Sequence, residues 1–216
     1  MRTLFFALCA ALACSLLPAH SASPAAPVAV TPLPSAAKSP KQIAAELPLS
    51  VKKYLLLASA DSMDKMADAA LQKQDVSDPR FSLIQVTDAL KNRPTDELPE
   101  EYRLYLAEML PVSEQMVNEI AALHGKVTAS KVEEIHRRYE AQIEEIGSRY
   151  PSAHEVFAQN EKSAAVMKYL MAELHLENDI MEYAMKNRKS AKENPEKASA
   201  DFMHFIAQKI RAATEK

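Results

Sequence analysis

Glycine is almost absent from this chain, which has two glycines, Gly125 and Gly147, in 216 residues. Turns, bulges and phosphate-binding loops use glycine because it adopts positive φ angles and lets the backbone approach closely. Neither glycine has a second one nearby, so the chain contains no P-loop and no dinucleotide-binding fingerprint. No strand-like alternation bounded by turn residues is found either. The sequence therefore predicts an all-α fold.

The first 22 residues have the order of a secretory signal peptide. Arg2 supplies a positive charge, an apolar run covers residues 4–17, and small residues suited to cleavage follow at 19–22. The apolar run is about 14 residues, shorter than the roughly 20 that a membrane-spanning helix needs. We expect residues 1–22 to be removed, giving an exported protein, periplasmic or secreted, whose mature chain has no transmembrane helix.

Both cysteines, Cys9 and Cys14, lie inside this segment. Cleavage near residue 22 would leave no thiol for a disulfide, a metal site or a nucleophile. Residues 11–14, Ala-Leu-Ala-Cys, also resemble the lipobox that precedes the acylated cysteine of bacterial lipoproteins. That resemblance implies a second possibility, an envelope lipoprotein anchored through Cys14.

Residues 23–38 are rich in proline and alanine, and residues 23–34 carry no charge. This composition favours an extended, disordered tether or tail over a packed element. We expect a single all-helical domain to follow at residues 39–216. The whole chain has 26 basic and 29 acidic residues, and this mildly acidic balance argues against a nucleic-acid partner.

Helix caps and prolines divide residues 39–216 into an irregular bundle of about six helices. Ser39, Pro40 and Gln42 have the pattern of an N-cap, a first helical proline and a capping box, and open a short helix that ends near Pro48. Later prolines and capping patterns predict the main helices, at residues 51–73, 79–90, 99–124, 130–150, 153–185 and from 195 onward.

Two of these predictions concern the arrangement of the bundle. Residues 99–150 should form a helical hairpin that turns at Gly125, with Ser130 and Glu133 as the capping box of its second arm. Residues 153–185 should form one long helix, capped by Ser152 and Glu155. Its apolar residues cover so wide an arc that we expect it at the centre of the bundle.

Met167, Met171 and His175 are the candidate metal ligands. On a continuous helix they stand at i, i+4 and i+8, on one face, and thioethers are soft ligands suited to Cu(I). The same methionines lie on an apolar seam, where methionine commonly fills gaps in a core. We favour core packing and expect no cofactor, with a copper or small-ligand carrier as the alternative.

The sequence contains no recognisable catalytic motif. His154-Glu155 lacks the second histidine of a zincin helix, and Glu133 with His136 supplies only one of the two Glu-x-x-His pairs of a di-iron bundle. A basic cluster spans residues 186–197, and we expect residues 186–193 to form a solvated loop or frayed turn, with contact to an anionic surface as the alternative.

These observations favour an exported protein that acts by binding, and they leave open an enzyme of the envelope whose site the sequence does not reveal. The expected partner is another protein of the cell envelope. The expected contact surface is the helical hairpin or the groove beside the long helix. Nothing in the sequence indicates the oligomeric state.

Overall fold

A computed structural model describes residues 38–74, 79–125, 127–158 and 161–215. The predicted signal peptide, Cys14 and nearly all of the predicted tether lie outside these residues. Within them helices are the only regular secondary structure, which confirms the all-α prediction. The helices are α2 (Pro40–Glu46), α3 (Leu49–Leu71), α4 (Pro79–Lys91), α5 (Glu100–Ala121), α6 (Ala129–Arg149), α7 (Pro151–Phe157), α8 (Glu161–Glu173), α9 (Glu177–Lys186), α10 (Arg188–Glu193) and α11 (Pro195–Thr214).

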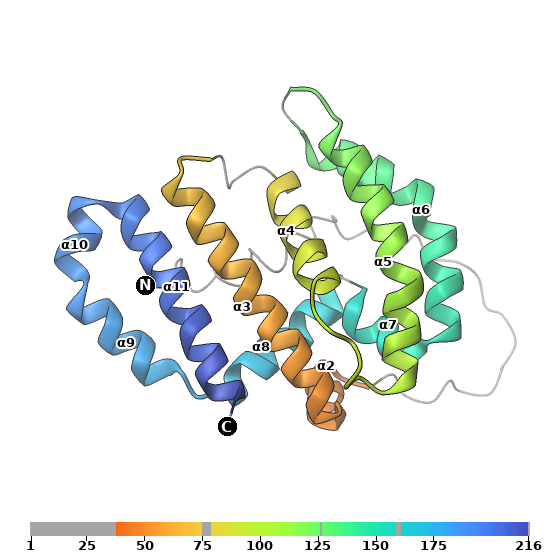
Figure 1. The fold of residues 1–216 in the computed structure, drawn as a ribbon, viewed down its shortest axis with the longest axis horizontal. Coiled ribbons are helices and arrows are strands. Elements are labelled where there is room, and N and C mark those ends of the chain that lie inside the picture. The colour runs from red at the N-terminus through yellow and green to blue at the C-terminus, as the bar shows by residue number, and fades with distance from the viewer. Residues whose placement is uncertain (1–37, 75–78, 126, 159–160, 216) are drawn as a thin grey trace, which may run out of the picture.

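Five helices lie side by side in the order α11, α3, α4, α5, α6, and α7 and α8 pass behind this row (Figure 1). The described helices number about ten, more than the six expected, because residues 153–185 are divided into three helices and the short helices α2 and α10 add to the count. None of them combines the length and the hydropathy that a membrane span requires.

Helix α3 occupies the centre of the bundle, between α11 and α4 (Figure 1). Its Val51 and Ala60 are fully buried, as are Ile206 and Ile210 on α11. On its other side the hydroxyl of Tyr54 donates to the Leu90 carbonyl at the end of α4, 2.6 Å away. Burial raises the pKa of Tyr54 to about 12.

The long central helix predicted at residues 153–185 is wrong, since this stretch forms α7, α8 and α9. The break between α8 and α9 lies at His175, whose φ of 51° is left-handed. Its neighbours Leu174 and Leu176 both pack on the core. Residues two apart point to opposite sides of a helix, so the helix must be interrupted between Leu174 and Leu176 for both side chains to reach the core.

The helical hairpin is confirmed as α5 and α6, packed along each other. Pro111 lies inside α5, and Gly125 in the connecting loop has a φ of 74°. The cap predicted at Ser130 is wrong, because α6 begins one residue earlier, after Thr128. The Ser152 cap is also wrong, since the Ser152 backbone N–H donates to Glu101 Oε1 at 2.9 Å.

Two other caps are confirmed. Ser39 and Gln42 form the complete capping box of α2, and the Asn194 side chain accepts from the Lys197 backbone N–H at the start of α11. Residues 188–193 form α10, so the loop predicted at residues 186–193 is wrong. Helix α10 has no buried residue, and its exposure agrees with the expected solvation.

Candidate functional site

The predicted metal ligands do not share one helix face. Met167 and Met171 lie on α8 and pack against the core. Helix α8 ends at Glu173, and His175 lies beyond it with an exposed side chain. The i, i+4, i+8 spacing needs a continuous helix, so helix geometry does not carry His175 to the methionine face. Copper binding by these three residues stays a prediction.

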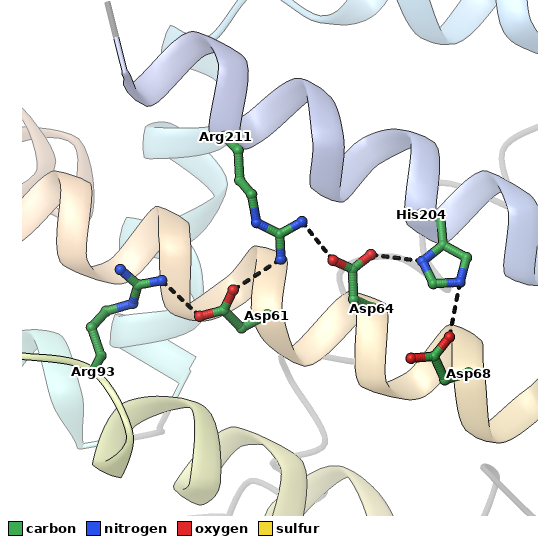
Figure 2. A network of polar contacts seen from close by, with 6 residues as sticks. All are labelled: Asp61, Asp64, Asp68, Arg93, His204 and Arg211. Carbon is green, nitrogen blue, oxygen red and sulfur yellow. Dashed lines mark hydrogen bonds and ion pairs between the residues drawn. The ribbon is translucent and has the colours of Figure 1, made fainter.

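A network of charged side chains joins α3 to α11 (Figure 2). Arg211 on α11 contacts two carboxylates of α3, Asp61 at 2.9 Å and Asp64 at 2.5 Å. Arg93, after α4, contacts the other oxygen of Asp61 at 2.6 Å. Asp61 therefore accepts from two guanidinium groups that belong to different parts of the chain.

His204 completes this network at its other end (Figure 2). Its Nδ1 lies 2.7 Å from Asp64 and its Nε2 lies 3.2 Å from Asp68. The Nδ1 contact is a hydrogen bond, and the Nε2 contact lies within ion-pair distance. The ring of His204 therefore lies between two carboxylates of α3.

The electrostatics of the network favour its charged forms. Burial by itself raises the pKa of Asp61, but hydrogen bonds from Arg211 and Arg93 outweigh burial and hold that pKa below its usual range. For Arg211, burial lowers the pKa, and the hydrogen bonds to Asp61 and Asp64 outweigh it and raise the pKa above its usual value. The charges are therefore paired across the interface between α3 and α11. We call this network the clasp; its members are Asp61, Asp64, Asp68, Arg93, His204 and Arg211.

Sequence reasoning missed this clasp, although its spacing is visible. Asp61, Asp64 and Asp68 follow one another at i, i+3 and i+7, and His204 and Arg211 are also seven residues apart. Each set therefore lies on one face of its helix. Among the described residues, no group of three or more His, Cys, Asp or Glu side chains is placed to hold a metal ion.

Helix α9 exposes two large apolar side chains. Met181 and Met185 are 61% and 67% exposed and, four residues apart, lie on the same side of the helix. The inner side is held by Tyr183, whose ring stacks on Phe205 of α11 with a centroid distance of 4.3 Å. Packing through Tyr183 thus leaves the two methionines outside.

Four exposed basic residues follow these methionines, at 186, 188, 189 and 192. Lys186 pairs with Glu182 at 2.5 Å, and Lys189 lies 4.0 Å from Glu193. No ion pair within the described part of the chain involves Arg188 or Lys192. We call Met181, Met185, Arg188 and Lys192 the α9–α10 surface.

Comparisons with protein-family models, with curated proteins and with solved structures find no match for this chain.

Proposed function

We propose that this protein is an exported binding module that contacts another protein of the cell envelope through its α9–α10 surface. The exposure of Met181 and Met185 is the observation that supports this proposal. Methionine is flexible and polarisable, and exposed methionines are common on surfaces that bind partner proteins. The location in the envelope rests on the export signal expected from residues 1–22.

The charges of the surface define the chemistry of the partner. Arg188 and Lys192 lie on α10, directly after the methionine face of α9. A complementary partner presents apolar side chains to the methionines and carboxylates to the two cations. Such charge pairs chiefly set the orientation and the association rate, while the buried methionines supply affinity.

Photo-crosslinking in the native envelope tests this proposal. A photoreactive residue at position 181 or 185 should capture one reproducible envelope protein, whereas the same residue at Arg137, exposed on α6, should not. The captured protein is then purified and its affinity measured directly. Met181→Glu with Met185→Glu should weaken binding at least about tenfold, equivalent to about 1.4 kcal/mol.

The matched control is Leu104→Glu, at an apolar side chain on α5 that is 39% exposed. This variant should retain the affinity, and circular dichroism should show native helicity in every variant. Equal affinity of the methionine variants and the unchanged protein would contradict the proposal. Capture of lipid alone at positions 181 and 185 would point instead to a membrane surface.

A further inference from the structure

A small pocket lies between α3, α4, α7 and α8, with a volume of about 70 Å³. Apolar side chains from all four helices line it, including Leu55, Leu90, Phe157 and Met167. Three buried serines, Ser59 and Ser62 on α3 and Ser163 on α8, add hydroxyl groups to the same lining. None of the side chains that line the pocket carries a charge.

Ser59 is the unusual member of this lining. It is 2% exposed, and its Oγ has no hydrogen-bond partner among the described residues. A serine within a helix commonly donates to the carbonyl four residues earlier, and an unpaired buried hydroxyl costs folding free energy. A polar atom left without a partner at an apolar pocket is the arrangement expected of a ligand site.

We infer that this pocket binds a small, neutral, mostly apolar molecule whose one polar group hydrogen-bonds to Ser59. A serine hydroxyl both donates and accepts, so an alcohol or a carbonyl oxygen satisfies it equally. The uncharged lining disfavours an ionised ligand, because a buried charge needs a partner.

The size of the pocket limits the ligand further. An engineered protein cavity of about 150 Å³ holds benzene, and this pocket has roughly half that volume. A short aliphatic chain therefore fits, and the unbranched side chain of Met167 can adjust to its shape. Met167 thus acts here as a pocket wall, independently of copper and of the α9–α10 surface.

The first test uses the unchanged protein. In a titration followed by ¹H–¹⁵N NMR, ethanol should shift backbone amides of α3 and α8 near the pocket and reach saturation. The same titration with chloroethane, similar in size but without a hydroxyl, should give at least about fivefold weaker binding. Shifts spread over the surface without saturation would overturn the inference, as would equal affinity for the two probes.

Two variants locate the site. Ser59→Ala should remove the preference for ethanol over chloroethane, and it should raise the melting temperature because the unpaired hydroxyl is gone. Ala164→Leu should fill the pocket and abolish the saturable shifts. Ser130→Ala, at an exposed position on α6, is the control and should change neither measurement. A lower melting temperature for Ser59→Ala would show that this hydroxyl is already satisfied, by a buried water for example, and would overturn the inference.

Discussion

At the scale of single residues, Gly147 shows how closely the hairpin meets α7. A Cβ placed at this position would lie 2.7 Å from Cγ of His154, well inside van der Waals contact. Nδ1 of His154 in turn lies 3.3 Å from the hydroxyl of Tyr105, whose side chain is fully buried. Glycine is used here for close approach and not for its backbone conformation.

Gly147→Ala should therefore lower the free energy of unfolding by about 1–3 kcal/mol, because the His154 ring must move away from its buried neighbour. Urea denaturation followed by circular dichroism measures this change. In a His154→Ala background the same substitution should cost little, since alanine is the better helix former. An equal loss in both backgrounds would show that the clash with His154 is not the cause.

At the scale of elements, the clasp selects the pairing of α3 with α11. Apolar burial holds the two helices together through residues such as Ile206 and Ile210, but apolar contacts alone tolerate some sliding. Arg211 and His204 each contact two aspartates, and these contacts fit one register only. The clasp is partly exposed, so we expect it to contribute more to the choice of register between α3 and α11 than to the free energy of unfolding.

Acidification should weaken this clasp. The folded-state pKa of Asp61 is lowered, so its contribution to stability is present at neutral pH and is lost as the pH falls through that lowered pKa. The loss should begin near the ordinary aspartate value of about 3.9. Asp61→Asn should reduce this component of the pH dependence, measured by urea denaturation between neutral and acidic pH.

Arg211→Gln should lower the stability at neutral pH by about 1 kcal/mol, because two aspartates lose their common partner at a partly exposed site. Lys131→Gln, at an exposed position on α6, is the matched control and should have little effect. If both variants unfold at the same urea concentration as the unchanged protein, the clasp does not stabilise the fold.

At the scale of the whole molecule, α9 and α10 lie at one end of the row of helices and the α5–α6 hairpin at the other (Figure 1). The α9–α10 surface and the pocket behind α3 and α4 lie on different elements. The proposed partner binding and the inferred small-ligand binding can therefore be tested separately, because the residues substituted for one test lie outside the elements that carry the other.

The mass of the protein purified from its own host envelope should correspond to a chain that begins near Ala22 or Ser23. This expectation follows from signal cleavage, and native mass spectrometry measures it. A chain that begins at an acylated Cys14 would show a lipoprotein instead.

The same measurement tests the copper carrier alternative. That alternative would be supported by a stoichiometric copper adduct that is lost in the double variant Met171→Leu with His175→Ala while helicity is retained.

The sequence by itself determined the helical class, the α5–α6 hairpin and the caps at Ser39 and Asn194. These features depend mainly on hydrogen bonds and steric limits within a few residues. The same local pattern also predicted caps at Ser130 and Ser152 that do not form, so it does not carry all of the capping information. Only the tertiary structure decided the division of residues 153–185 at His175, the central place of α3, the clasp and the pocket at Ser59. Each of these depends on which side chains, distant in the sequence, meet in the core. A local pattern of apolar residues indicates which side of a helix is buried, but it does not indicate which other helix that side packs against.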